Sequence, residues 1–145
     1  SHYEDILAVR VKNIFPKSVW EPRYQHIIDF ERMLADEGTT IVKIFLHISK
    51  DEQKQRLQAR LDNVVKHWKF NPDDLKDRAR WDDFQEVYED LIAKTSTESA
   101  PWYVVPADRK WYRNLVVARI IVDTLKDLDM KFPIADWMAE DIVID

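Results

Sequence analysis

The chain has a single glycine, Gly38, among its 145 residues. Phosphate-cradling loops, whether of the Walker or of the dinucleotide-binding type, need more than one glycine, because their backbone amides must approach the phosphate with no side chain in the way. Neither type of loop can therefore form within these residues. If the chain handles nucleotides or phosphate, it lacks the usual cradle.

The composition favours one globular domain of the cytoplasm. Hydrophobic residues make up 46% and charged residues 34%, which is the balance of a folded soluble protein. There is no cysteine, which excludes disulfides, thiolate metal sites and cysteine nucleophiles and suits a reducing compartment. The net charge of −5 argues against general nucleic-acid binding, and the apolar runs are too short to span a membrane. We expect no nucleic-acid or membrane partner, and no metal site, because the four histidines have no metal-ligand spacing.

The strongest structural signal is the segment 39–48, TTIVKIFLHI. It is nearly continuous in apolar, β-branched and aromatic residues, which predicts a strand buried on both faces in a parallel sheet. Ser49 follows with Glu52 at the third helical position, so a capping box should begin a helix that runs to about Lys66. The other expected elements are helices over 1–13 (where the spacing also fits a strand), 24–37 with its stop at Gly38, about 72–80, 81–95 and 109–128 with Asp108 as its cap, and a short strand over 101–106, PWYVVP.

The order strand, helices, strand, helix is typical of a layered α/β fold. Two parallel strands need neighbours to form a stable sheet. Either the first residues hide another strand, or part of the sheet lies outside this chain. We interpret Trp68, Trp81, Trp102 and Trp111 as core residues of this fold rather than as base-stacking platforms.

The charge is uneven along the chain. Residues 50–81 contain nine basic and six acidic residues, a net charge of +3, so the remainder carries −8. Arg56 and Arg60 are four residues apart and share a helix face, and two guanidinium groups on one face suit a phosphate chain, because each can hold two oxygens. Lys66 and Lys69 extend this basic cluster. The alternative is an ordinary solvated helix face with mixed salt bridges.

Several longer strings carry a likeness that no single motif would. They are SHYEDIL (1–7), RYQHIIDFERML (23–34), GTTIVKIFLHISKDEQKQRLQARL (38–61), KHWKF (66–70), RWDDFQEVYEDLI (80–92) and TSTESAPWYVVPADRKWYRNLVV (95–117). Together they resemble the C-terminal part of the polyphosphate kinase 2 family, over nearly everything from Ser1 to about Leu128. SHYED and YED are similar to the branch that phosphorylates nucleoside mono- or diphosphates from polyphosphate.

The resemblance implies a P-loop-kinase-like fold, a three-layer α/β/α sandwich with a helical lid, here incomplete at its N-terminus. It implies Mg²⁺-dependent transfer of phosphoryl groups between inorganic polyphosphate and AMP- or ADP-type nucleotides, in a protein that tends to form homo-oligomers. Residues 1–132 would be the C-terminal half of the domain, with the lid at about 49–81. The acidic tail 133–145 has no evident counterpart in the family.

The resemblance also places the start of this sequence within the family pattern. In the family, the Walker A loop lies upstream and holds the nucleotide-side phosphates and the metal, and the Walker B stretch ends in an Asn-Arg-Ser-His-Tyr string. Since the sequence begins at that serine, Ser1, Tyr3 and Asp5 are interpreted as the remainder of the Walker B stretch. The Mg²⁺ ligands are expected mostly outside this chain.

Four basic residues take functional roles by the same resemblance. Arg56 matches a lid arginine that contacts phosphate, and Arg60, Lys66 and Lys69 belong to the same basic lid. Arg56 and Arg60 are the expected catalytic residues, and Arg56, Lys66 and Lys69 are expected to bind polyphosphate. They would neutralise charge on the chain being cut and on the equatorial oxygens of the transition state, where loss of one such group typically costs on the order of a hundredfold in rate.

Two positions depart from the family pattern. Asn63-Val64 stands where many members carry an Asp-Pro pair, so we expect the lid helix to end differently. Glu86 stands where some branches carry a basic residue, which leaves the length of the donor or acceptor open.

Three functions therefore stay open. The first is the lid half of a polyphosphate-dependent nucleotide kinase, inactive or nearly so as this chain alone because it has no phosphate loop. The second is a non-catalytic module that binds polyphosphate, or a kinase subunit through an exposed sheet edge. The third is a structural relic with no ligand. The first two require the basic residues to face a shared groove rather than to scatter outward, each paired with a carboxylate.

Overall fold

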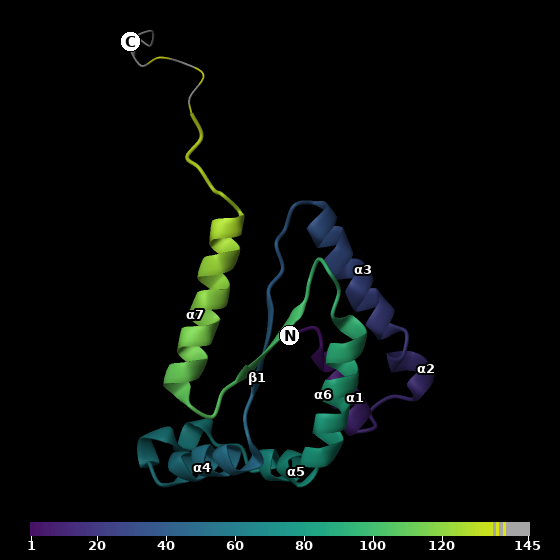
Figure 1. Ribbon diagram of the computed structural model, residues 1–145. Helices are drawn as coiled ribbons and strands as arrows, with labels where there is room; N and C mark the ends of the chain where they lie inside the picture. Colours follow the sequence, from purple (N-terminus) through teal and green to yellow (C-terminus); the bar gives the residue numbers. More distant parts are fainter. Residues whose placement is uncertain (135, 137, 139–145) are drawn as a thin grey trace, which may run out of the picture.

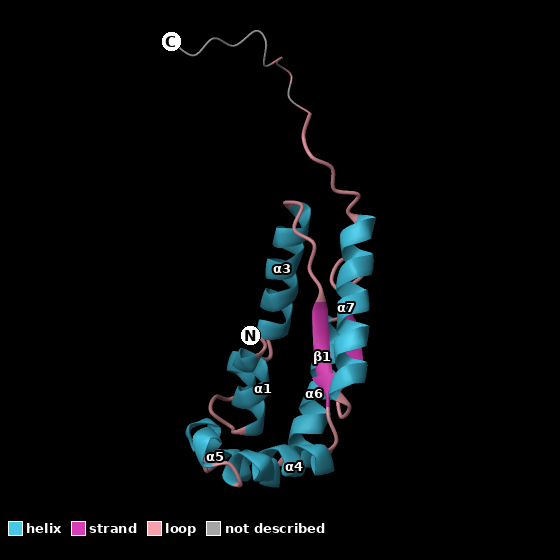
Figure 2. Ribbon diagram, turned by 90° about the vertical axis from the view of Figure 1, so that its left-hand side faces the viewer, coloured by secondary structure: helices cyan, strands magenta, loops and turns pink. Residues whose placement is uncertain are grey.

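The computed structural model describes residues 1–134, 136 and 138. In chain order the elements are α1 (Glu4–Val11), α2 (Lys17–Trp20), α3 (Arg23–Asp36), β1 (Lys43–His47), α4 (Lys50–Leu61), the 3₁₀ helix η1 (Val64–Lys69), α5 (Asp73–Ala79), α6 (Trp81–Thr95), β2 (Trp102–Pro106) and α7 (Lys110–Asp127). α7 lies on one side of the two strands, and α1, α3 and α6 lie on the other (Figure 1, Figure 2). Helices combined with a parallel sheet confirm the α/β class. Residues 135, 137 and 139–145 of the predicted tail lie outside the described residues.

The two strands pair in parallel, as the sequence predicts. The register runs from Lys43 opposite Trp102 to His47 opposite Pro106. The prediction of a first strand buried on both faces is wrong, since β1 is shorter than 39–48 and its Leu46 is 45% exposed. Among the described residues β2 is the only strand that pairs with β1, and α7 packs against β2. One edge and part of one face of β1 are therefore uncovered.

The main core lies on the other side of the sheet, where α1, α3 and α6 pack together. Its buried members are Tyr3, Ile6, Leu7, Val11, Tyr24, Ile27, Val87 and Leu91. The first residues form a helix, so the alternative of a strand hidden there is wrong. The predicted span 81–95 is confirmed for α6, whose amphipathic pattern is strong enough to fix both ends.

Gly38 ends α3 as predicted. Its φ is +85°, in the left-handed region that suits glycine. The N–H of Gly38 donates to the carbonyl of Ala35, and the N–H of Thr39 donates to the carbonyl of Leu34, each at 2.9 Å. These bonds satisfy carbonyls at the end of the helix and turn the chain toward β1.

A buried polar cluster joins α3, β1 and α6. The ammonium of Lys43 donates to Glu31 Oε2 at 2.8 Å and to the carbonyl of Thr95 at 2.6 Å. The Tyr3 hydroxyl donates to Glu31 Oε1, and Trp102 Nε1 donates to Thr95 Oγ1 at 2.9 Å. Burial, together with the neighbouring Glu31 carboxylate, raises the pKa of Tyr3 above its usual range. The cluster fixes the first residues of the chain against the strand.

A second polar cluster centres on Asp90 of α6. The Tyr24 hydroxyl donates to Asp90 Oδ2 at 2.8 Å, Lys94 pairs with Oδ1 at 2.8 Å, and Arg10 also donates to Oδ2. Partial burial by itself raises the pKa of Asp90, but the hydrogen bonds from these three partners outweigh it and lower the pKa to about 2.

Acid should weaken the fold through Asp90. The pKa of Asp90 is about 2 in the folded protein and 3.8 without its partners. The contribution of Asp90 to the stability of the fold is therefore fully present above pH 3.8 and is lost as the pH falls through about 2. We expect Asp90→Asn to flatten the pH dependence of the free energy of unfolding between these values, as measured by urea denaturation. Glu89→Gln, which alters an exposed acid on the same helix, is the control. Parallel pH profiles for wild type and Asp90→Asn would contradict the assignment.

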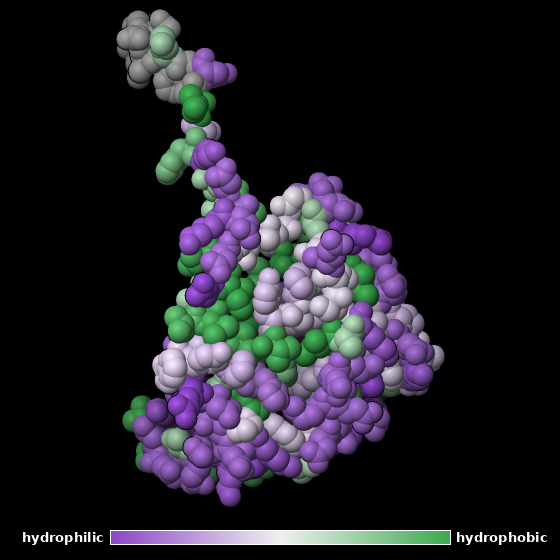
Figure 3. Space-filling model, in the orientation of Figure 1, coloured by the Kyte–Doolittle hydropathy of each residue, from purple (hydrophilic) through white to green (hydrophobic). Residues whose placement is uncertain are grey.

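The apolar stripe of α7 is exposed. Leu115, Ile121, Val122 and Leu125 are each between 45% and 59% exposed. Figure 3 shows hydrophobic side chains gathered on the face between α7 and the strands. The described residues thus leave a continuous apolar face in contact with solvent.

Candidate functional site

Two hollows open where the two parallel strands end. In α/β sheets, ligands bind outside the carboxyl ends of the strands, and here His47 ends β1 and Pro106 ends β2. The first hollow, of about 490 Å³, is called the arginine hollow and is lined by Phe45, Leu46, His47, Ile48, Gln53, Arg56, Leu57, Arg60, Asp74, Asp77, Trp81, Phe84, Gln85 and Tyr88. The second, of about 410 Å³, is called the aromatic hollow and is lined by His47, Ser49, Pro106, Asp108, Arg109, Trp111 and Tyr112. His47 borders both.

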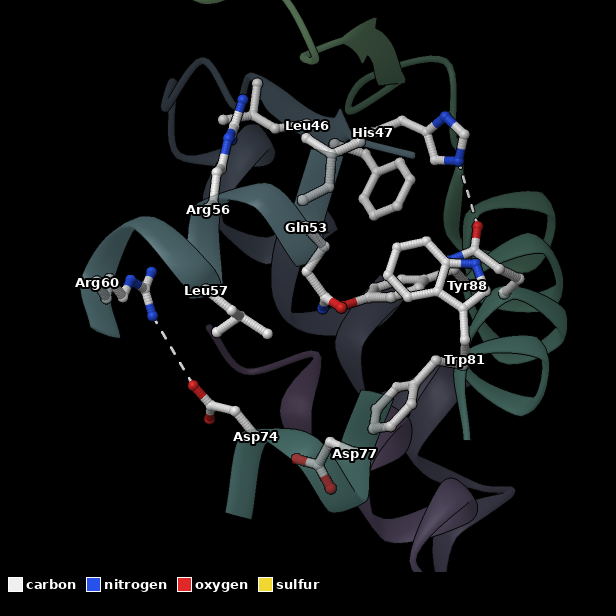
Figure 4. Close-up of a pocket in the computed structure, with 14 residues that line it drawn as sticks. Leu46, His47, Gln53, Arg56, Leu57, Arg60, Asp74, Asp77, Trp81 and Tyr88 are labelled. Atoms are coloured by element: carbon white, nitrogen blue, oxygen red, sulfur yellow. Dashed lines mark hydrogen bonds and ion pairs between the residues drawn. The ribbon is translucent and has the colours of Figure 1, made fainter. Parts of the chain in front are cut away.

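Helix α4 brings Arg56 and Arg60 to the same hollow, as their spacing predicts (Figure 4). The helix begins at Ser49, whose hydroxyl accepts from the N–H of Glu52 at 3.1 Å. The predicted capping box is only half formed, because the Glu52 carboxylate accepts from Arg56 and not from the Ser49 amide.

The guanidinium of Arg56 is held on two sides. Its Nε donates to Glu52 Oε1 at 2.7 Å, and its Nη2 donates to the carbonyls of Ala107 and Asp108 at 2.7 and 3.3 Å. Arg56 Nη1 takes part in none of the hydrogen bonds found among the described residues. The fixed orientation suits a group that must meet an anion with little loss of side-chain entropy.

Arg60 is held more loosely than Arg56. Its Nη1 donates to the carbonyl of Lys69 at 3.3 Å and lies 3.8 Å from Asp74 Oδ2, the contact dashed in Figure 4. The two arginines therefore line one hollow, although each also has a carboxylate nearby. The aromatic rings of Trp81 and Tyr88 line the other side of this hollow.

Lys66 and Lys69 lie on η1 and are not among the residues that line the arginine hollow. α4 ends at Leu61, so the prediction of a helix to about residue 66 is wrong. Asn63 has extended backbone angles, and its side chain accepts from the N–H of Val65 at 3.1 Å, which starts a separate turn. The ammonium of Lys69 lies 4.8 Å from the centre of the Trp68 ring.

The expectation of buried tryptophans is wrong for two of the four. Trp68 is 78% exposed and Trp111 is 64% exposed. Trp81 and Trp102 are partly buried, as interpreted. Trp68 lies on the separate η1 turn and Trp111 on the uncovered face of α7, so neither has a core to enter.

The three residues at the start of the chain do not join the arginines. Tyr3 is buried and donates to Glu31. The backbone carbonyl of Asp5 accepts from Arg23 at 2.6 Å, and Asp5 borders a separate hollow of about 300 Å³. Ser1 is exposed. None of the three lines the arginine hollow.

Asp108 links the ends of the two strands. The prediction that it caps α7 is wrong, because the N-cap is Arg109 and Asp108 Oδ1 instead accepts from the backbone N–H of Ser49 at 2.7 Å. This backbone hydrogen bond is the main cause that lowers the pKa of Asp108. Local sequence reasoning missed this contact between residues 59 apart. The strand register could have found it, since extending the pairing of His47 with Pro106 by two residues would bring Ser49 opposite Asp108.

Neither a metal site nor a membrane segment is found in the described part of the chain. No three His, Asp or Glu side chains there come together in a way that could hold a metal ion, so none is assigned as a ligand of Mg²⁺. No described helix has both the length and the apolar character that crossing a bilayer requires.

Comparisons with known proteins agree with one another. A family model described as polyphosphate kinase 2 matches residues 1–133. An AMP/ADP-polyphosphate phosphotransferase of Meiothermus ruber is 62% identical over 145 residues, covering 100% of this chain and 54% of that protein. An ADP-polyphosphate phosphotransferase of Rhodopseudomonas palustris is 43% identical, over 92% of this chain and 50% of that protein.

A solved structure shares the arrangement of the elements. The crystal structure of polyphosphate kinase 2 from Arthrobacter aurescens TC1 matches with a TM-score of 0.90 and 49% identity, over 96% of this chain and 49% of that one. The chain thus spans about half the length of the relatives that it matches.

Proposed function

The chain belongs to the polyphosphate kinase 2 family, and on that premise we propose that it is the phosphate-gripping part of a polyphosphate-dependent nucleotide kinase. The whole enzyme would transfer phosphoryl groups between inorganic polyphosphate and AMP- or ADP-type nucleotides. Relatives named for that activity, at 62% and 43% identity, support the proposal. The observation that carries it is that Arg56 and Arg60 line one hollow at the carboxyl ends of the strands.

The chemistry asks for positive charge at fixed positions. In the transfer, an oxygen of the acceptor phosphate forms a bond to the terminal phosphorus of the donor, and the bond from that phosphorus to the next bridging oxygen breaks. Negative charge builds on the leaving phosphate and on the equatorial oxygens, and catalysis consists mostly of positioning and stabilising that charge. Arg56, fixed by Glu52 and by the β2–α7 loop, and Arg60 would bind these oxygens.

We propose the finer architecture together with this function. Residues 49–81 would act as the lid, and the domain would be a P-loop-kinase-like three-layer sandwich to which this chain contributes residues 1–132. The phosphate loop and most ligands of Mg²⁺ would come from the half of the relatives that this chain does not span. Mg²⁺ would neutralise phosphate charge there. The apolar face of α7 supports a larger assembly, including a homo-oligomer.

A second candidate is a non-catalytic polyphosphate-binding module. The single glycine favours it, because no phosphate loop can form within these residues. Both candidates predict binding of polyphosphate. They differ in phosphoryl transfer, which requires a phosphate-binding loop that these residues do not form.

Titration of the chain with long-chain polyphosphate tests the proposal. We expect binding that weakens about tenfold between about 50 and 200 mM salt if two phosphates are contacted, because each contact releases counterions. Polyglutamate, an equally anionic polymer without phosphate, should bind more weakly. We expect no ATP from ADP and polyphosphate with this chain alone.

Each other outcome is informative. No binding of polyphosphate at low salt would leave the structural relic. Equal binding of polyglutamate would reduce the site to a general polyanion surface. ATP formation by this chain alone would contradict the need for a separate phosphate loop.

A further inference from the structure

We propose that Asp108 is a positioning residue for Arg56, holding α4 so that the guanidinium stays at the edge of the arginine hollow; the inference rests on the proposed function. An acidic residue beside a site for polyphosphate is unfavourable on charge alone. Its hydrogen bonds give a reason for its presence there.

Apolar packing does little to orient α4. Leu57 is the one buried residue of this helix. The orientation of α4 therefore depends on hydrogen bonds. Arg78 of α5 donates to the carbonyl of Lys50 at 2.6 Å and to Gln53 Oε1 at 2.9 Å, which holds the side of the helix nearest α5.

Asp108 connects the start of α4 to the ends of the strands. Its carboxylate accepts from the N–H of Ser49 at 2.7 Å, one residue before α4 begins. Arg56, two turns farther along, reaches back to the carbonyls of Ala107 and Asp108 in the same loop. The start of the helix and the functional side chain are thus fixed to one short segment at the end of β2.

Charge and positioning predict opposite signs for the loss of Asp108. Without its carboxylate, the site loses one negative charge, and a pure charge effect would tighten the binding of polyphosphate. If Asp108 positions Arg56, its loss frees the start of α4 and weakens binding. Asp74 provides the comparison, because its carboxylate lines the arginine hollow and lies 3.8 Å from Arg60 without accepting from α4's backbone.

The test measures polyphosphate binding by five variants in low salt. We expect Asp108→Ala to weaken binding about tenfold, the scale of one charge-assisted hydrogen bond. Asp108→Asn, which keeps an acceptor oxygen for the Ser49 amide, should bind within about twofold of wild type. Asp74→Ala should bind as tightly as wild type or more tightly. Arg56→Ala should weaken binding, and adding Asp108→Ala to it should cause little further loss, because Asp108 acts only through the position of Arg56.

The outcomes separate this inference from the proposed function. If Arg56→Ala binds polyphosphate like wild type, the role proposed for Arg56 fails. If Arg56→Ala is weakened but Asp108→Ala binds as tightly as Asp74→Ala, the positioning role alone is overturned. Asp108→Asn as weak as Asp108→Ala would also overturn it, because the acceptor oxygen would then not matter.

A pair of Ser49 variants tests the same bond from the donor side, and still decides the question if Asp108→Ala fails to fold. Ser49→Pro removes the N–H that Asp108 accepts, at a φ of −72° that proline adopts readily. Ser49→Ala removes only the hydroxyl cap. We expect Ser49→Pro to weaken binding clearly more than Ser49→Ala, and equal binding by the two would refute the inference.

Discussion

Replacing Lys43 with methionine should lower the free energy of unfolding by about 3 to 5 kcal/mol, the cost of leaving one member of a buried ion pair without its partner. The side chains of Lys43 and Glu31 are 5% and 4% exposed, and the ammonium also satisfies the carbonyl of Thr95. Methionine fills a similar volume but donates no hydrogen bond. Glu31 would then be a buried carboxylate with only Tyr3 and the half-exposed His2 as partners.

Two controls isolate the buried charge. Lys76→Met removes a lysine whose ion pair with Asp73 is exposed, and such pairs contribute little to stability, so this variant should unfold close to wild type. The double variant Lys43→Met with Glu31→Leu removes both charges and should be more stable than Lys43→Met alone. Urea denaturation measures all of these, and a loss of less than about 1 kcal/mol in Lys43→Met would show that the pair is not desolvated as the structure has it.

Replacing both Arg56 and Arg60 with alanine should weaken the binding of polyphosphate by at least about a hundredfold. Hydrogen bonds to charged groups contribute about 1.5 to 3 kcal/mol each, and every 1.4 kcal/mol is about tenfold in affinity. Partial exposure of both side chains places the expectation at the low end. The slope of binding against salt should fall as well, because fewer phosphates are contacted.

Lys66→Ala with Lys69→Ala is the matched control, since it removes the same charge outside the arginine hollow. We expect it to weaken polyphosphate binding by less than the arginine pair does. A loss as large as that of the arginine pair would show that net charge, and not the geometry of the hollow, holds the phosphate. It would also place Lys66 and Lys69 in the primary site.

Local signals in the sequence predict most of the elements. The ends of α6, the strand β2 and the stop at Gly38 follow from periodicity, proline and glycine, which act within a few residues. The errors have two causes. Burial of β1 depends on distant residues, namely those that cover the sheet. The early end of α4 is local, because Asn63 turns the chain two residues after the helix.

The candidate site follows the same division. Helical spacing brings Arg56 and Arg60 together without any tertiary information. The contacts that orient Arg56 come from Ala107 and Asp108, more than 50 residues away. Local capping rules predict that Asp108 caps the helix that follows it, whereas its carboxylate accepts a hydrogen bond from the backbone N–H of Ser49, just after β1.

The exposed apolar side chains of α7 also affect the association state of this chain in solution. Four large aliphatic side chains of α7 are exposed to solvent. Burying them between two molecules would favour association by about 25 cal/mol for each Å² of apolar surface removed from water. Sedimentation at several protein concentrations therefore belongs beside every titration. Association through these residues would make part of the protein inaccessible to the ligand and would distort the measured stoichiometry.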